Sequence, residues 1–282
     1  MEVKRKAGRK PNLPVFQSFD RREGWEDEES STLPLLHPDE ILHTMRLRAS
    51  QLTKDFGHRS IVKNATLSVN PGEVVTIFGP NGAGKTTLIK ILATLLKPTS
   101  GALEIEGRDA IANYSDVRST LGVVIHEVLA YPAFSPYENL KFFGRMYGVE
   151  QLEHRCIKLL TEVGLQRFAH EPLHIFSRGM TQRFMIARAL LHHPSVLLLD
   201  EPFSGLDASA KQFVLDRIAQ EQQSGKGIVI TTHNTELGYL VGTRFFFMIN
   251  GELAEIAEKD EIAAETLLLM YEERLLGAAP KQ

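Results

Sequence analysis

The chain of 282 residues has little cysteine, no long apolar run and almost no net charge. Its one cysteine, Cys156, has no second cysteine with which to form an internal disulfide, a usage typical of a reducing compartment. No apolar run approaches the roughly 20 residues that a membrane-spanning helix needs, and no signal-peptide apolar region follows the basic N-terminus. The net charge of −3 argues against generic nucleic-acid binding. We therefore expect a chain that is soluble or attached to a membrane only through a partner.

Residues 1–44 differ in composition from the rest of the chain. Basic residues gather between Lys4 and Lys10, and acidic residues between Glu23 and Glu29. Charge blocks of this kind usually stay solvated, so the pattern predicts a disordered charged extension. A patch for anionic lipid or for targeting is the alternative interpretation of the basic cluster. We place the folded domain at 45–257 and a C-terminal helix and tail at 258–282.

A glycine-rich turn organises the folded part of the sequence. It follows the apolar run 74–78 and precedes a helical pattern at 87–92, an order typical of a phosphate-binding loop. Backbone N–H groups and the helix N-terminus would then surround an anion. Lys85 is expected to reach the β- and γ-phosphates of a nucleotide, and the Thr86 hydroxyl to bind Mg²⁺. The residues predicted to form this nucleotide-binding turn are Gly79, Pro80, Asn81, Gly82, Ala83, Gly84, Lys85, Thr86 and Thr87.

Periodicity predicts an α/β fold around this turn. The short apolar runs 195–200 and 227–232 indicate central parallel strands covered on both faces, and 245–256 indicates a final hairpin. Residues from about 129 to 192 are mainly helical in pattern, with one apolar stripe that includes Ile157 and Leu160. A terminal helix is expected at 260–276, with Leu268 and Tyr271 on its apolar stripe.

Three polar residues follow buried strands. Asp200 ends the apolar run 196–199 and would hold Mg²⁺ through water, and Glu201 would accept a proton from, or orient, an attacking water. His233 follows the run 227–232. A lone histidine there is more often structural than catalytic, but the carboxyl ends of strands face the nucleotide in such folds, which favours a role at the γ-phosphate.

A second anion seat is predicted at the start of another helix. Ser177 is suited to cap the helix that ends near Leu191, and a serine and a glycine, Gly179, at a helix N-terminus favour anion binding. Many helices begin in this way, so the pattern by itself is weak.

Taken together, these motifs resemble the nucleotide-binding subunit of an ATP-binding-cassette transporter, over about residues 45–255. The order of the motifs is far more specific than any one of them. They are the Walker A motif (79–87), the signature (176–180), the Walker B motif (196–201), the D-loop (204–207) and the switch histidine His233.

The resemblance implies a P-loop NTPase with a RecA-like mixed sheet core, an antiparallel β subdomain and an inserted helical subdomain at about 129–192. It implies ATP hydrolysis with Mg²⁺, with Lys85, Glu201 and His233 as catalytic residues. Phe56 would stack on adenine, and Ser177 and Gly179 would contact the γ-phosphate of ATP held by a second copy. The implied partners are that second nucleotide-binding domain, in a homodimer, and an integral-membrane subunit on a separate chain. This subunit would hold the protein at the cytoplasmic face of the membrane. No nucleic-acid partner is implied.

Two segments depart from the family pattern. In the signature, Arg178 replaces a glycine and Met180 replaces a glutamine; a positive charge near a phosphate seat is compatible with function. In the segment that should supply the Q-loop glutamine, His126 or Glu127 stands instead. Glu127 would meet Mg²⁺, or His126 would hydrogen-bond water. These features resemble exporter ATPases, including the haem exporters of cytochrome c maturation, which predicts export of haem or another small molecule.

Two other classes of protein share the phosphate-binding loop. Soluble ATPases of translation or DNA repair resemble two fused cassettes, or one cassette split by a long coiled coil, and this chain has one cassette and no heptad run. A P-loop kinase acting on a small molecule would not need the signature, the D-loop or His233.

Overall fold

The computed structural model describes residues 45–125, 127 and 129–278. The extension expected at 1–44, the residue His126 and the tail beyond 278 lie outside the described residues, so the predictions made for them remain predictions. Within the described residues, no helix is long and apolar enough to cross a membrane.

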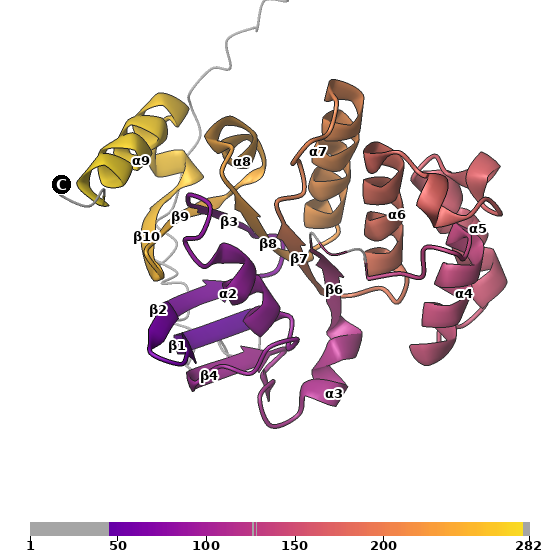
Figure 1. The fold of residues 1–282 in the computed structure, drawn as a ribbon, viewed down its shortest axis with the longest axis horizontal. Coiled ribbons are helices and arrows are strands. Elements are labelled where there is room, and N and C mark those ends of the chain that lie inside the picture. Colours follow the sequence, from indigo (N-terminus) through magenta and orange to yellow (C-terminus); the bar gives the residue numbers. More distant parts are fainter. Residues whose placement is uncertain (1–44, 126, 128, 279–282) are drawn as a thin grey trace, which may run out of the picture. The chain divides into compact units, whose positions relative to one another are not determined.

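A mixed sheet runs through the domain (Figure 1). Its parallel part is ordered β9-β3-β8-β7-β6. All residues of β3, β7 and β8 are buried, as expected for parallel strands covered on both faces. The predicted parallel strands at 195–200 and 227–232 are therefore confirmed. The bounds of these strands are β3 Val74–Phe78, β6 Leu121–Val124, β7 Val196–Asp200, β8 Gly227–Thr232 and β9 Arg244–Ile249.

Antiparallel strands extend the sheet beyond β9. The predicted final hairpin is formed by β9 and β10, and a single bridge, Glu252 to Lys63, connects β10 to β2. The hairpin β1–β2 then pairs with β4, and β4 with β5. The bounds are β1 Leu47–Phe56, β2 Arg59–Val69, β4 Ser100–Ile105, β5 Arg108–Asp109 and β10 Glu252–Glu258.

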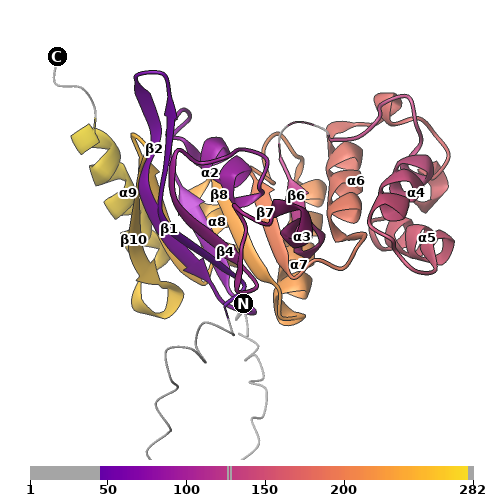
Figure 2. The same ribbon diagram turned by 90° about the horizontal axis from the view of Figure 1, so that it is seen from below.

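Helices cover both faces of the parallel strands (Figures 1 and 2). Helix α2 (Lys85–Leu92) shares one apolar core with the antiparallel strands, through Leu88 and Leu92. On the opposite face, α6 (Arg178–Leu190) and α7 (Ala208–Gln223) share a second core with β7. Helix α8 (Thr235–Val241) contacts β3. The α/β fold class with an antiparallel part is thus confirmed.

Residues 129–192 contain α4 (Pro136–Met146), α5 (Leu152–Glu162) and α6, grouped at one end of the domain in Figure 1. A capping box starts α4: Ser135 Oγ accepts from the Glu138 N–H at 3.3 Å, and the Ser135 N–H donates to Glu138 Oε2 at 2.8 Å. The expected apolar stripe of α5 is partly wrong, because Ile157 is 42% exposed. The buried arc is centred on Cys156 and Leu160, and Ile157 lies about 100° away from Cys156 around the helix.

Shorter segments connect these elements. Helix α3 (Tyr114–Val117) precedes β6, and four 3-10 turns complete the described chain. Their bounds are η1 Arg118–Thr120, η2 Gln166–Phe168, η3 Leu173–Ile175 and η4 Lys259–Glu261.

The terminal helix α9 (Ala264–Ala278) packs beside β9. It buries Leu267 and Tyr271 in a cluster with Phe78, the last residue of β3. The predicted stripe is wrong at Leu268, which is 40% exposed, because Leu267 and Tyr271, four residues apart, define the buried face. Helix α9 therefore supports the strand that leads into the glycine-rich turn.

Candidate functional site

The glycine-rich turn connects β3 to α2. Gly84 caps α2 in a left-handed conformation with φ of 106°, and Gly82 has φ of 81°; both conformations favour glycine. A Cβ atom on Gly84 would lie 2.6 Å from the Ile61 carbonyl oxygen, and one on Gly79 would collide with the Met248 carbonyl. Two of the glycines are thus required by close backbone packing, which fixes the turn at the N-terminus of α2.

Lys85 is the buried cation of this turn, with 6% of its surface exposed. Its Nζ donates to the carbonyl oxygens of Gly79 at 2.6 Å and Pro80 at 3.2 Å. The same atom lies 3.3 Å from Glu201 Oε1. These oxygens compensate the charge and hold the ammonium group at the start of α2, where an anion would be bound.

Asp200, at the end of β7, connects β8 to the start of α2. Its Oδ2 accepts a hydrogen bond from Thr86 Oγ1 at 2.7 Å, and its Oδ1 accepts one from Thr231 Oγ1 at 2.5 Å. The expected proximity of Thr86 and Asp200 is therefore present. A hydroxyl beside a carboxylate fits Mg²⁺, which takes one or two protein oxygens together with phosphate oxygens and water. The described residues contain no group of three or more His, Cys, Asp or Glu that could hold a metal, so the remaining ligands would come from the nucleotide and water.

Glu201 is oriented by its backbone and by two side chains. Its φ is 50°, an unfavourable value for a non-glycine residue, and its N–H donates to the Thr231 carbonyl at 2.9 Å. Its Oε2 lies 2.9 Å from Nδ1 of His233, which follows β8. Glu201 therefore joins His233 to Lys85, so the three residues predicted to be catalytic form one cluster at the carboxyl ends of β3, β7 and β8.

An open pocket of about 570 Å³ lies over the turn. Phe56, 52% exposed, lines it at the end of β1, and Lys54 Nζ lies 5.2 Å from the centre of the Phe56 ring. The pocket brings together these predicted residues: Phe56, Pro80, Asn81, Gly82, Ala83, Gly84, Lys85, Thr86, Thr87 and Glu201. Sequence reasoning missed Arg59 and Ile61, which also line it. Arg59 pairs with Phe56 across the turn at Gly57, so a hairpin predicted around this glycine would have indicated Arg59.

The predicted second anion seat lies on α6, and Ser177 and Gly179 do not line this pocket. Ser177 caps α6, with Oγ accepting from the Met180 N–H at 3.3 Å, and it is exposed. A Cβ atom on Gly179 would lie 3.3 Å from the Ala210 side chain of α7. Arg178 Nη2 lies 3.5 Å from Ser204 Oγ. The seat thus faces solvent and is separate from the nucleotide pocket of its own chain.

Glu127 follows β6 and is 66% exposed at its side chain. Its Oε1 forms an ion pair with Lys90 Nζ of α2 at 2.8 Å. The role at Mg²⁺ expected of Glu127 remains a prediction.

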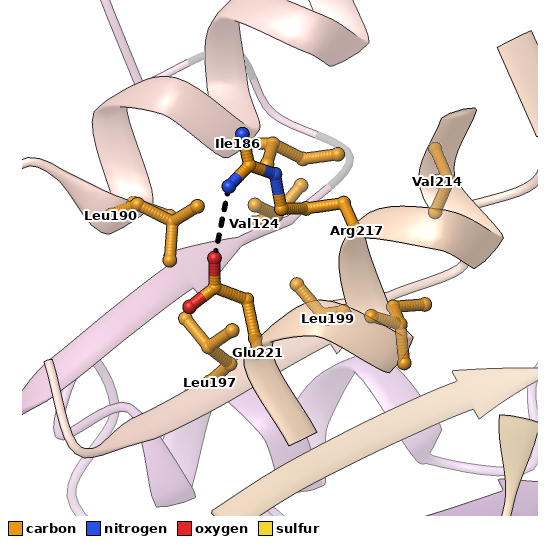
Figure 3. A pocket seen from close by; sticks show the side chains of 10 residues that line it. Val124, Ile186, Leu190, Leu197, Leu199, Val214, Arg217 and Glu221 are labelled. Atoms are coloured by element: carbon orange, nitrogen blue, oxygen red, sulfur yellow. Dashed lines mark hydrogen bonds and ion pairs between the residues drawn. The ribbon is translucent and has the colours of Figure 1, made fainter. Parts of the chain in front are cut away.

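A small cavity lies between β7 and the helices α6 and α7 (Figure 3). Its volume is about 10 Å³, about enough for one water. Arg217 and Glu221 lie at its wall, with Nη1 to Oε1 at 3.1 Å, among apolar side chains such as Leu197. None of the residues that line this cavity lines the nucleotide pocket.

Comparison with known proteins extends these observations. The family model described as "ABC transporter" matches residues 62–204. The linearmycin resistance ATP-binding protein LnrL of Bacillus subtilis is 31% identical over 77% of this chain and 71% of its own length. The lantibiotic transport ATP-binding protein SrtF of Streptococcus pyogenes is 34% identical over 82% of this chain and 97% of its own. The dimeric post-hydrolysis structure of the ATP-binding cassette MJ0796, bound to ADP and Pi, is 26% identical with a TM-score of 0.68, covering 75% of this chain and 99% of that one.

Proposed function

The chain belongs to the ABC transporter family as an ATP-binding subunit with ATPase activity, and on that premise we propose that it drives translocation of a small molecule by a separate membrane subunit. One observation carries the assignment of its active site. Beside the nucleotide pocket, Thr86 contacts Asp200. Glu201, the next residue, contacts both Lys85 and His233.

The contacts support a role for each residue in ATP hydrolysis. Glu201 orients a water molecule and accepts its proton as the water oxygen attacks the γ-phosphorus. The bond between that phosphorus and the β–γ bridging oxygen breaks, giving ADP and phosphate. Lys85 offsets the negative charge on the phosphate oxygens, and His233 holds Glu201 in place. Thr86 and Asp200 would hold Mg²⁺, whose charge likewise offsets that of the phosphates.

A second copy of the chain completes each site in this proposal. Ser177 is exposed and Gly179 is half-buried at the start of α6, and both lie outside the pocket. The dipole at the N-terminus of this helix is therefore available to a phosphate held by another molecule. The dimeric state of the related ADP-bound cassette supports a homodimer with two such sites. ATP binding would favour the closed dimer because it adds contacts that only that state makes.

The helical end of the domain provides the surface for the membrane subunit. Tyr131, Phe134 and Phe142 are 46%, 43% and 39% exposed, and the ring centres of Tyr131 and Phe142 are 5.2 Å apart. A hollow of about 240 Å³ beside them is lined by Phe143 and Tyr147. A cluster of exposed aromatic side chains is typical of an interaction surface. The protein would thus lie at the cytoplasmic face of the membrane, held there by this partner.

The cargo is proposed only by class. Two curated relatives are named for linearmycin resistance and for lantibiotic transport, which supports export of a small molecule. The prediction of haem as that molecule, drawn from the signature and His126, has no support in these names.

Replacing Glu201 with Gln tests the active site. The variant should bind ATP as the wild type does, hydrolyse it at least about 100-fold more slowly, and accumulate as a dimer with ATP, because proton acceptance is lost while the binding contacts remain. Turnover at the wild-type rate would refute the role of Glu201.

Fractionation of cells tests the transport function. The full chain should sediment with membranes when its integral partner is present and be released when that partner is absent. A chain that remains in the soluble fraction in both cases would favour the alternative, a non-transport ATPase of translation or DNA repair.

A further inference from the structure

The signature arginine packs against the turn that follows the catalytic glutamate. A Cβ atom built on Gly205 would collide with Cζ of Arg178 and lie 2.8 Å from its Nε. The guanidinium group therefore occupies the space that a side chain at position 205 would need. It also reaches Ser204 Oγ, at 3.5 Å from Nη2. Gly205 has φ of +65°, a conformation that glycine adopts at little cost.

The position of this arginine is electrostatically unusual. Arg178 is the first residue of α6, where the partial positive charge of a helix N-terminus disfavours a cation. Its guanidinium group lies over the neighbouring turn. The starts of α6 and α7 are packed together there, because Gly179 is close to Ala210. Asp207 caps α7, its Oδ1 accepting from the Ala210 N–H at 2.8 Å. Residues 177–179 and 204–207 thus form one packed unit.

The same turn is bonded to the backbone of Glu201. The Ser204 N–H donates to the Glu201 carbonyl oxygen at 3.1 Å. Because Glu201 has a left-handed φ of 50°, its side-chain direction depends on the backbone contacts on both sides of it. A shift of residues 204–205 would therefore be transmitted to the carboxylate that contacts Lys85 and His233.

We propose that Arg178 is a positioning residue for ATP hydrolysis: it covers Gly205, holds the turn 204–205 and thereby fixes Glu201 of the same chain. The inference rests on the proposed function, because it assigns Arg178 a role in the reaction of Glu201. The proposal predicts different effects of Arg178 on nucleotide affinity and on the rate of hydrolysis. Nucleotide affinity depends on Phe56 and the turn 79–87, which lie on other elements, whereas the rate of hydrolysis depends on the direction of Glu201.

A direct electrostatic role is the competing explanation. If Arg178 acted by its charge on a phosphate held by the second copy, any cation at position 178 would serve, and its loss would weaken ATP binding. If it acts by covering Gly205, the flat guanidinium group is required and lysine does not replace it.

Steady-state ATPase kinetics of the full-length protein separate the two explanations. We expect Arg178→Ala and Arg178→Lys to lower kcat about 10-fold, with KM for ATP within about twofold of wild type, because sub-ångström displacement of a catalytic group is costly. Arg167→Ala, which removes another exposed arginine of the helical region, is the matched control and should retain wild-type kinetics.

A double-mutant cycle tests the specific contact. Gly205→Ala should lower kcat by displacing the guanidinium group, and combining it with Arg178→Ala should cost little more than the worse single change, since both break one contact. The strain of alanine at a positive φ is present in both backgrounds and cancels in the cycle.

Three results would overturn the inference: a raised KM with unchanged kcat, full activity of Arg178→Lys beside an impaired Arg178→Ala, or multiplicative losses in the cycle. None of these affects the proposed function, which fails separately if Glu201→Gln keeps wild-type turnover. Circular dichroism of each variant confirms that folding is intact.

Discussion

The nucleotide pocket and the signature segment, residues 176–180, differ in the hydrogen bonds and ion pairs that their polar side chains form. Around the pocket, Lys85, Asp200 and Glu201 each contact other functional residues of the same chain, and Lys85 is almost fully buried. In the signature segment, Ser177 caps its own helix and is otherwise exposed at the surface. One region is assembled within the chain, whereas the other presents its anion seat outward.

This contrast is the one expected of an active site that is divided between two molecules. The carboxyl ends of parallel strands place the first group of residues side by side, because β3, β7 and β8 are neighbours in the sheet. The start of α6 lies beside no other strand end of the sheet; Arg178 packs on the turn at 204–205, and Gly179 lies close to Ala210 of α7. The energy of binding a phosphate at the second seat is therefore available for association of two copies.

Mixing two inactive variants gives the largest expected effect and tests this division directly. Lys85→Ala and Ser177→Arg should each lower ATPase activity about 100-fold or more, the first by removing the buried cation and the second by filling the anion seat. In a mixture, a dimer of one copy of each has one site with an intact Lys85 and an intact facing Ser177. We expect the mixture to recover a substantial part of the activity, measured as phosphate release against each variant alone.

The matched control is a mixture of Lys85→Ala with Glu201→Gln. Both changes lie on the same side of the site, so every dimer lacks one or the other in each pocket and no recovery is expected. Recovery in this control, or its absence in the first mixture, would contradict a site shared between two copies.

Replacing Phe56 with Ala tests whether the nucleotide pocket binds the base of ATP by stacking. Stacking of a base on an aromatic ring contributes about 1–3 kcal/mol, so KM for ATP should rise about 10-fold while kcat changes little. Phe56→Tyr keeps the stacking surface and is the control. Equal losses for triphosphate alone and for ATP, measured by competition with a fluorescent nucleotide, would show that Phe56 does not contact the base.

The last prediction concerns stability, at the contact between the C-terminal end of α6 and β6. Burial lowers the pKa of His192 to about 4, despite the hydrogen bond between its Nε2 and the Leu121 carbonyl at 3.0 Å. Its ring stacks on Tyr147, with 4.0 Å between ring centres. Below pH about 6.5 the imidazole of His192 binds a proton in the unfolded chain but not in the native chain. The free energy of unfolding therefore decreases as pH falls from 6.5 toward 4.

Urea unfolding at pH 7 and pH 5 measures this contribution. The free energy of unfolding of the wild type should fall by about 2 kcal/mol more than that of His192→Gln, which does not titrate. His154→Gln, at an exposed position of α5, is the control and should follow the wild type. Identical pH dependence of the wild type and His192→Gln would contradict the assignment.

Much of the fold followed from local patterns in the sequence. The apolar runs that became β3, β7 and β8 are continuous because both faces of these strands are buried. The helical stripes were predicted less accurately: Ile157 and Leu268 are exposed, since which side of a helix is buried depends on the partner it packs against. The contact of Arg178 with Gly205 was not found from sequence, because it depends on how α6 packs on the turn before α7.

Residues adjacent in the chain were enough to predict the phosphate-binding turn, the acidic ends of the strands and the class of chemistry, because these depend on local backbone geometry. The folded structure was needed to find the contacts of Asp200 with Thr231, of Glu201 with Lys85 and His233, and of Arg178 with Gly205. Such contacts join residues far apart in the chain, and they form only when burial of the apolar strands and helices fixes the order of the sheet and the packing of α6 on α7.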